Sequence, residues 1–287
     1  MRCFMLGAAA AETMASTMAS GAGATSLDLV ASYGLADQLS QSNTNFHPQG
    51  LGYDAATGQL LFAQQSAGAL YFTDLEGVVQ GSRSVAFNHV TSVAADASSY
   101  YFSDYSANSD GLDVYALSKS GGAAAPLSTE IAAYGGYPID VRDGKLYRTD
   151  ASAGYGWGDL GQLRISSLLS PDTIDAVVTL ETTFGIGDIA VDLDRNALWA
   201  LDYSETASIR QFDLTSGLQL AAFDLGLDGL TAGLTYADNR LYYYDWTSPS
   251  GSTLSVYALD AASVPLPASG LLLAAGLGAV GWMRRHA

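Results

Sequence analysis

The stretch Ile189-Ala-Val-Asp-Leu-Asp-Arg-Asn-Ala-Leu-Trp199 places an apolar strand, a polar turn and a second, aromatic-bearing strand in succession. This order is typical of a β-hairpin. Four other segments follow the same plan: Leu51–Phe62, Val93–Phe102, Ile139–Tyr147 and Leu234–Tyr242. The turn aspartates of the five segments lie 42, 47, 49 and 46 residues apart, at Asp54, Asp96, Asp143, Asp192 and Asp238. The sequence therefore predicts an internal repeat.

This period suits a β-propeller blade of four strands. We expect third strands at Ala69–Thr73, Leu112–Leu117, Gln162–Ser166, Ser208–Leu214 and Thr253–Leu259. We expect fourth strands at Ser82–Phe87, Pro126–Ala132, Thr173–Leu180 and Leu218–Leu225. The fifth unit lacks a fourth strand, and Ser26–Tyr33 would supply it from the other end of the chain, which removes an open edge. The prediction is an all-β propeller over residues 25–262 with five four-stranded blades, or six if an irregular stretch hides another.

Composition excludes some classes of function. The 287 residues include 29 Asp and Glu against 12 Lys and Arg, so no basic surface is available to bind nucleic acid. The single cysteine, Cys3, allows neither an internal disulfide nor a zinc-type cysteine cluster. The sequence contains no His-Glu-x-x-His, Gly-x-Ser-x-Gly, P-loop or dinucleotide motif, which favours a protein that is not an enzyme.

The N-terminus has features of a secretory signal peptide over residues 1–24. Arg2 precedes the apolar run Cys3–Ala11, and Ala22-Gly-Ala24 has the small-x-small form of a signal-peptidase site. Glu12 interrupts the apolar segment, and a disordered start or a wrongly chosen start codon is the alternative interpretation.

The C-terminus carries an uncharged run of 16 residues, Ala268–Met283, which would span roughly 24 Å as a helix. A bilayer core needs about 20 residues, so the run is slightly short. Trp282 suits the membrane interface, and the following Arg pair suits the cytoplasmic side. We predict one C-terminal transmembrane helix rather than a buried core helix, because the run has no polar face and follows a Pro-x-Pro.

The three-part order of residues 263–287 resembles the PEP-CTERM class of sorting signals, in its VPLPA variant. The motif residues are Val264, Pro265, Leu266, Pro267 and Ala268, followed by the apolar run and then by Arg284 and Arg285. The resemblance implies a Gram-negative bacterium, cleavage by signal peptidase, transient anchoring in the inner membrane and processing by an exosortase near Pro267-Ala268. It further implies delivery to the cell surface or the extracellular matrix, where such proteins are associated with exopolysaccharide.

The second strands of the units end in an aromatic-x-x-Asp pattern, which is similar to YWTD, NHL and gluconolactonase-like propellers. The aspartates concerned are Asp104, Asp150, Asp202 and Asp245, whereas the first unit has Gln64-Gln65 instead. In those families this aspartate mainly holds neighbouring blades by hydrogen bonds. The resemblance therefore implies a structural role for all four residues, as a buried carboxylate must be paired.

Residues at the start of the first strands would converge at one mouth of the central channel: His47, His89, Asp188 and Asp228. Imidazole with carboxylate suits a transition metal or an acid–base pair. The alternative is that they are ordinary loop histidines and turn aspartates. Gluconolactonase-like enzymes hold a metal with one Glu, two Asn and an Asp, and no Glu stands at a first-strand start here.

Two further patterns are candidate sites. Asp192, Asp194 and Asn196 have the first spacings of a calcium loop, although Ala197 and Tyr203 replace its Gly and Glu. Hairpin turns also favour Asp and Asn without calcium. Tyr155 and Trp157 lie in a Gly-rich segment and could stack on sugar rings, or pack within their own loop.

Two hypotheses follow. In the first, the propeller is a non-enzymatic, exported surface protein that binds extracellular polysaccharide or another surface protein. In the second, it is an extracellular metal-dependent hydrolase or lactonase that works at the channel mouth.

Overall fold

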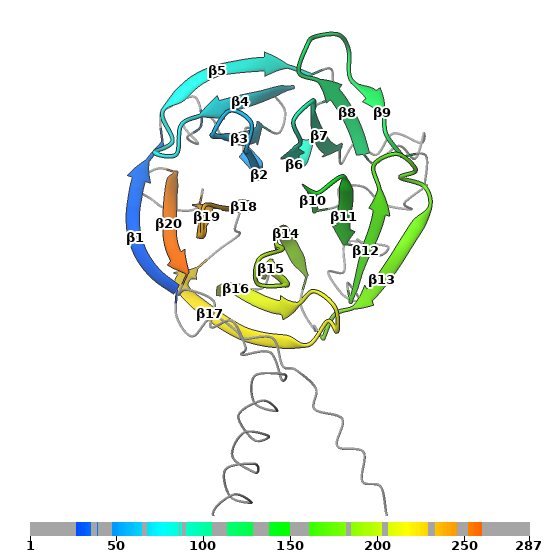
Figure 1. Ribbon diagram of the computed structural model, residues 1–287. Helices are drawn as coiled ribbons and strands as arrows, with labels where there is room; N and C mark the ends of the chain where they lie inside the picture. The colour runs from blue at the N-terminus through cyan, green and yellow to red at the C-terminus, as the bar shows by residue number, and fades with distance from the viewer. Residues whose placement is uncertain are drawn as a thin grey trace, which may run out of the picture. The chain divides into compact units, whose positions relative to one another are not determined.

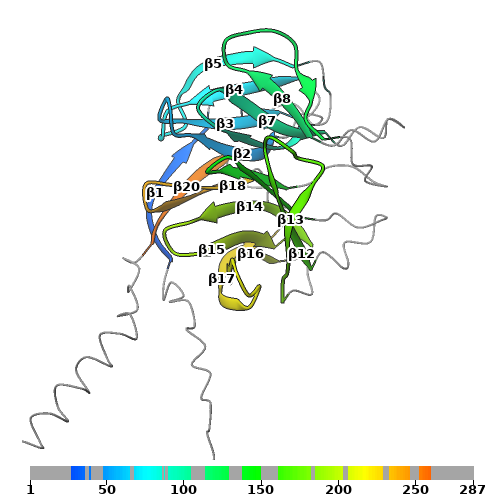
Figure 2. The same cartoon turned by 45° about the vertical axis from the view of Figure 1, so that its right-hand side comes forward.

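The structure is a computed structural model, and it describes residues 27–35, 39, 48–64, 68–85, 87, 90–104, 114–128, 138–149, 161–181, 185–202, 206–228, 233–245 and 252–259. These residues form five antiparallel sheets of four strands, which surround a central axis as the blades of a propeller (Figure 1). Figure 2 shows the same blades obliquely. The predicted all-β propeller of five blades is therefore confirmed.

The strands of each blade follow one another outward from the axis. Blade 1 consists of β2 (Pro48–Asp54), β3 (Gln59–Gln64), β4 (Ala69–Thr73) and β5 (Val79–Ser84). Blade 2 consists of β6 (Val90–Ala95), β7 (Ser99–Asp104), β8 (Val114–Ser118) and β9 (Ala125–Pro126). Blade 3 consists of β10 (Ile139–Arg142), β11 (Lys145–Thr149), β12 (Gln162–Ser167) and β13 (Ile174–Thr179).

Blade 4 consists of β14 (Ile186–Asp192), β15 (Ala197–Asp202), β16 (Thr206–Asp213) and β17 (Gln219–Asp228). Blade 5 consists of β18 (Gly233–Ala237), β19 (Arg240–Asp245), β20 (Thr253–Leu259) and β1 (Leu27–Gly34). The outer strand β1 pairs with β20 from Leu27↔Leu259 to Gly34↔Thr253. The predicted closure by the N-terminal strand is therefore confirmed.

The turns between first and second strands explain the recurrent Asp and Asn of the repeat. Asp143 and Gly144 have φ values of 49° and 71°, and Asp238 and Asn239 have 48° and 62°. Two consecutive positive φ angles are those of a type I′ turn, whose twist matches that of the flanking strands. Asp, Asn and Gly adopt this conformation most readily, which suits them to the turns of blades 3 and 5. In the other three units the turn Asp accepts backbone N–H groups two or three residues further on.

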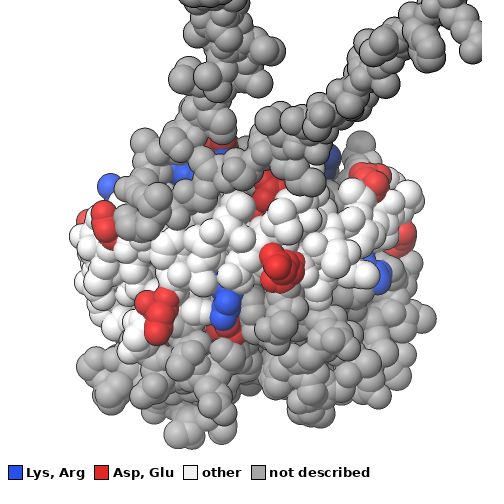
Figure 3. Space-filling model, turned by 90° about the horizontal axis from the view of Figure 1, so that it is seen from below, with Lys and Arg blue, Asp and Glu red and all other residues white. Residues whose placement is uncertain are grey.

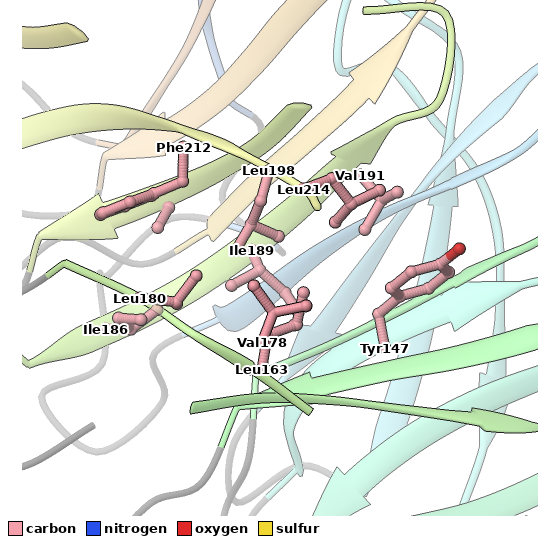
Figure 4. Packing of buried hydrophobic residues seen from close by; sticks show 11 residues of the cluster. Tyr147, Leu163, Val178, Leu180, Ile186, Ile189, Val191, Leu198, Phe212 and Leu214 are labelled. Atoms are coloured by element: carbon pink, nitrogen blue, oxygen red, sulfur yellow. The ribbon is translucent and has the colours of Figure 1, made fainter. Parts of the chain in front are cut away.

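The core lies between the faces of neighbouring blades. Between blades 3 and 4, Leu163 and Val178 of one blade meet Ile189, Leu198 and Phe212 of the other (Figure 4). Burying a side chain of this size fully contributes about 1.5–3 kcal/mol. Each blade is covered on both faces, so its second strand is buried on both sides.

The run Tyr242-Tyr243-Tyr244 on β19 illustrates this double burial. All three side chains are at most 1% exposed. Tyr242 and Tyr244 belong to the cluster shared with blade 1, whereas Tyr243 belongs to the one shared with blade 4. Alternation along the strand therefore sends neighbouring tyrosines into different interfaces rather than to solvent.

The two ends of the blades carry connections of different length. Connections from first to second and from third to fourth strands lie at one end, which we call the hairpin face, and none exceeds the six residues of 119–124 or 168–173. The other connections lie at the opposite end, the long-connection face. They include residues 35–47, 127–138 and 150–161, which are 13, 12 and 12 residues long.

Residues 1–26 and 260–287 lie outside the described part of the chain. Both the predicted signal peptide (1–24) and the predicted sorting signal (263–287) fall there entirely. Within the described ranges, no helix is long and apolar enough to cross a membrane.

Candidate functional site

Asp188 lies on the innermost strand of blade 4 and is fully buried. Its Oδ2 accepts hydrogen bonds from the backbone N–H groups of Leu51 at 3.3 Å and Leu234 at 3.0 Å. Its Oδ1 accepts from the Ser92 hydroxyl at 3.0 Å and from the N–H of Ile189 at 3.0 Å. The carboxylate thus has four donors.

Three of the four donors come from other blades, while the N–H of Ile189 belongs to blade 4 itself. Leu51, Ser92 and Leu234 belong to blades 1, 2 and 5. The hydroxyl of Ser92 also accepts the N–H of Ile139 in blade 3 at 3.0 Å. All five blades therefore meet around one carboxyl–hydroxyl pair, and side chains fill the axis at this level.

Burial is the main influence on Asp188. It raises the pKa of this carboxyl well above the ordinary value for Asp, and the four hydrogen bonds only partly oppose the increase. The described residues place no cation in contact with Asp188 that would neutralise it.

Glycine allows the inner strands to come this close. A Cβ on Gly50 would lie 2.5 Å from the Cα of Ser92, and one on Gly233 would lie 2.7 Å from the Cβ of Leu51. The Cβ of any other residue at these positions would push the inner strands apart, away from the hydrogen bonds to Asp188.

A second group of hydrogen bonds joins the inner strands nearer the hairpin face. Asp140 Oδ2 accepts the N–H of Val191 at 2.7 Å and lies 3.2 Å from Nε of Arg142. The Arg142 guanidinium then reaches the backbone carbonyl of Tyr236 at 2.9 Å. Blades 3, 4 and 5 are joined in this way. Burial raises the pKa of Asp140, although Arg142 and two backbone N–H donors oppose it.

Ion pairs join the blades farther from the axis. Lys119 of blade 2 lies 2.6 Å from the Asp54 carboxylate of blade 1. Arg83 of blade 1 donates to the carbonyls of Ser118 at 2.6 Å and Gly122 at 3.2 Å in blade 2. Both basic side chains thus hold blade 1 to blade 2.

The predicted channel-mouth residues have different positions. Asp188 lies beside the axis, as expected from its place in the repeat, and its carboxyl is bonded to the other blades. The backbone of Asp228 ends β17, the outermost strand of blade 4, opposite Thr206 and five residues before β18 begins. His47 and His89 lie outside the described residues, so a shared site of the four stays a prediction.

The predicted calcium residues have separate partners. Asp192 is buried, and Arg195 is paired with it at 3.0 Å. Asn196 donates to Asp213 at 3.0 Å, whereas Asp194 is exposed. In the described ranges, no three His, Cys, Asp or Glu side chains are close enough together to hold a metal ion.

The predicted structural aspartates are described in part. Asp202 accepts hydrogen bonds from Ser208 at 3.1 Å and Arg210 at 2.7 Å, both on the next strand of its own blade. Asp104 and Asp245 are buried at the ends of β7 and β19. The remaining predicted residues lie outside the described part: Asp150, Tyr155, Trp157 and the sorting-signal residues Val264, Pro265, Leu266, Pro267, Ala268, Arg284 and Arg285.

Sequence reasoning missed Ser92, Asp140 and Arg142. The strand Ile139-Asp-Val-Arg142 contained a usable signal, since two opposite charges two residues apart on an inner strand must be paired when buried. Ser92 carried no such signal, because a serine in a strand is common and its importance depends on Asp188, which is 96 residues away.

The exposed charges are mostly acidic. Figure 3 shows charged side chains separated by uncharged surface on one side of the molecule. Among the described residues, the exposed bases are Lys145 and Arg240. The exposed acids are Asp28, Glu76, Asp143, Asp172, Asp175, Glu181, Asp194, Asp224 and Asp238.

The sequence matches no protein-family model and no curated protein. Solved structures show similarity of fold. The crystal structure of Myxococcus xanthus glutaminyl cyclase has a TM-score of 0.59 with 14% identity, covering 82% of this chain and 97% of that one. A nidogen/laminin complex has a TM-score of 0.47 with 16% identity, covering 70% of this chain and 73% of that one. At these identities the likeness to the cyclase concerns the propeller fold alone.

Proposed function

We propose that the chain is an exported, non-enzymatic binding module of the cell surface or extracellular matrix, whose propeller recognises a polysaccharide or another surface protein. The observation that carries this proposal is that the axial carboxylates are hydrogen-bonded within the propeller. Asp188 and Asp140 are bonded to neighbouring blades, and their environment suits a scaffold rather than a reaction centre. A ligand would then be bound by surface side chains.

The charge distribution favours one class of partner. Arg83, Lys119, Arg142 and Arg195 contact carbonyls or carboxylates inside the propeller, and this leaves the exposed charge predominantly negative. Such a surface repels uronate-rich or sulfated polymers. We therefore expect the polysaccharide to be neutral or to carry amino groups.

The long-connection face is the proposed binding face, since loops held by a rigid scaffold commonly carry binding residues. Its connection 150–161 contains Tyr155 and Trp157, the aromatic pair that the sequence suggests for stacking on sugars. The signal peptide and the sorting tail support export, and this part of the proposal also rests on sequence.

Binding is tested on a glycan array that carries neutral, amino and uronate polymers, with the full chain in mild detergent. We expect retention on neutral or amino polymers, and at least a tenfold loss for Trp157→Ala, because truncating an aromatic residue at the centre of a binding site costs about 2 kcal/mol or more. Leu169→Ala is the matched control, since Leu169 is 97% exposed in a turn at the hairpin face. Equal binding of both variants and the wild type would contradict the proposed face.

Export is tested by mass spectrometry of the surface form, whose ends should lie after Ala24 and near Pro267. The metal-dependent hydrolase remains the alternative, based on His47 and His89. Elemental analysis of the purified chain separates the two hypotheses. A stoichiometric metal lost in a His47→Ala, His89→Ala variant would favour the hydrolase.

A further inference from the structure

The Ser92 hydroxyl lies between two acceptors on the axis. Its Oγ is 3.0 Å from Oδ1 of Asp188 and 3.3 Å from the carbonyl oxygen of Ile139, while it accepts the N–H of Ile139 at 3.0 Å. A hydroxyl has one proton to donate and two lone pairs. It can therefore serve only one of the two acceptors at a time.

Both protonation states of Asp188 leave every hydrogen-bond donor in this cluster with an acceptor. When Asp188 is ionised, Ser92 donates to its Oδ1. When Oδ1 carries a proton taken from solvent, that O–H donates to Ser92 Oγ, and the hydroxyl turns to the carbonyl of Ile139. Oδ2 keeps the N–H groups of Leu51 and Leu234 in both states. Every hydrogen-bond donor of the cluster therefore has an acceptor in either arrangement.

We propose that Asp188 and Ser92 form a proton-responsive lock on the propeller axis, which holds the five blades together in both states and strengthens as Asp188 takes up a proton. Rotation of one hydroxyl exchanges the two states without moving the backbone. The inference is independent of the ligand and of the proposed function.

The direction of the response follows from burial. Burial raises the pKa of Asp188 above its value in the unfolded chain, so the folded state binds the proton more tightly. Stability from this group is then fully present below the unfolded pKa of about 4 and is lost as pH rises through the folded pKa. Across that window, each pH unit lowers the folding equilibrium constant by at most about tenfold.

Other titratable groups lie on the strands packed around Asp188. None of the described ones is hydrogen-bonded to Asp188. They are Tyr53 and Asp54 on β2, Asp140 and Arg142 on β10, Asp192 on β14, Asp202 on β15 and Tyr236 on β18. Strand β6 has no titratable residue. His47 and His89 precede β2 and β6 and lie outside the described residues, so the experiment must remove their contribution.

The experiment measures unfolding of the full chain in mild detergent from pH 4 to pH 8. Asp188→Asn resembles the protonated state in part: its amide NH2 can donate to Ser92 and its carbonyl can accept from Leu51 and Leu234, while the N–H of Ile189 loses its acceptor. The exposed Asp175→Asn is the matched control. The stability of the wild type should decline with rising pH, and the stability of Asp188→Asn should decline less. We expect the same difference when His47 and His89 are replaced by Gln. Asp175→Asn should keep the wild-type pH profile.

Infrared spectroscopy from pH 4 to pH 8 provides a second measurement that does not require Asp188→Asn to fold. At the acidic end the wild type should show the C=O band of a buried protonated carboxyl, and Ser92→Ala should shift this band to higher frequency, because the O–H of Asp188 loses its acceptor. An unchanged band in Ser92→Ala would overturn the proposal. So would a pH-independent stability difference between the wild type and Asp188→Asn.

Discussion

Replacing Gly50 with alanine should destabilise the propeller far more than a single added methyl group usually does. Gly50 lies on β2 beside the axis, where its Cβ would be 2.5 Å from Ser92 Cα and 3.0 Å from the nitrogen of Val93. Both neighbours are backbone atoms and cannot rotate away. Since carbon atoms in contact lie about 3.5–4.0 Å apart, β2 and β6 must separate by roughly 1 Å.

That separation would break hydrogen bonds to the axial carboxyl. The bonds from Leu51 and Ser92 to Asp188 are already 3.3 and 3.0 Å long, and an added ångström removes both. Overpacking costs about 1–3 kcal/mol, and each lost hydrogen bond costs about 1 kcal/mol. We expect Gly50→Ala to lower the free energy of unfolding by about 3–5 kcal/mol.

Urea unfolding followed by tryptophan fluorescence measures this loss, with Trp199 as a fully buried reporter. Gly81→Ala is the matched control in the same blade, because its Cβ would approach only the Cδ2 of Phe72, at 3.9 Å. The control should change stability by less than about 1 kcal/mol. If Gly50→Ala proves as stable as the control, the inner strands do not pack against each other at the axis as described.

Two other changes test ties away from Asp188. Arg195→Met should lower the free energy of unfolding by about 3–5 kcal/mol, because it leaves the buried Asp192 without its cation. Adding Asp192→Asn should restore part of this loss in the same urea experiment. Burial acts to raise the pKa of Asp96, but hydrogen bonds from Tyr101 and backbone N–H groups outweigh it and hold the pKa below its ordinary value. Asp96→Asn should therefore destabilise the chain at pH 7, and the difference in unfolding free energy from the wild type should shrink as pH falls below about 4. A difference that grows toward acid pH would contradict the prediction.

The blade pattern could be predicted from sequence because turns and inner strands impose strict local requirements. Asp143-Gly144 and Asp238-Asn239 must adopt positive φ, whereas the turn Asp of the other three units accepts backbone N–H groups two or three residues further on. Both requirements restrict the residue types at this place in the repeat. Outer strands have weaker requirements. For β5 the sequence predicts Ser82–Phe87, because Val85 and Phe87 are apolar, whereas the strand is Val79–Ser84. Val85 instead donates its N–H to the carbonyl of Gly68 and packs in the core shared with blade 2.

The axial cluster could be predicted only in part. The place of Asp188 at the start of an inner strand indicated a position beside the axis. Its partners were not predictable, because three of its four donors are backbone N–H groups, which every residue except proline offers. Which of them face Asp188 depends on how five blades close into a ring. The imidazole groups predicted beside Asp188 are those of His47 and His89, which lie outside the described residues.

The pairing of β1 with β20 determines when the fold can be completed. Leu27 and Leu259 are partners although 259 − 27 = 232 residues separate them in the chain. Contacts of such high sequence separation form late, as the entropy of closing the intervening segment must first be overcome. Until then β20 has a free edge, which is the surface that strands of other chains pair with. A nascent chain therefore passes through an open ring that can pair with strands of other chains, and a chain that lacked β1 or β20 would remain open.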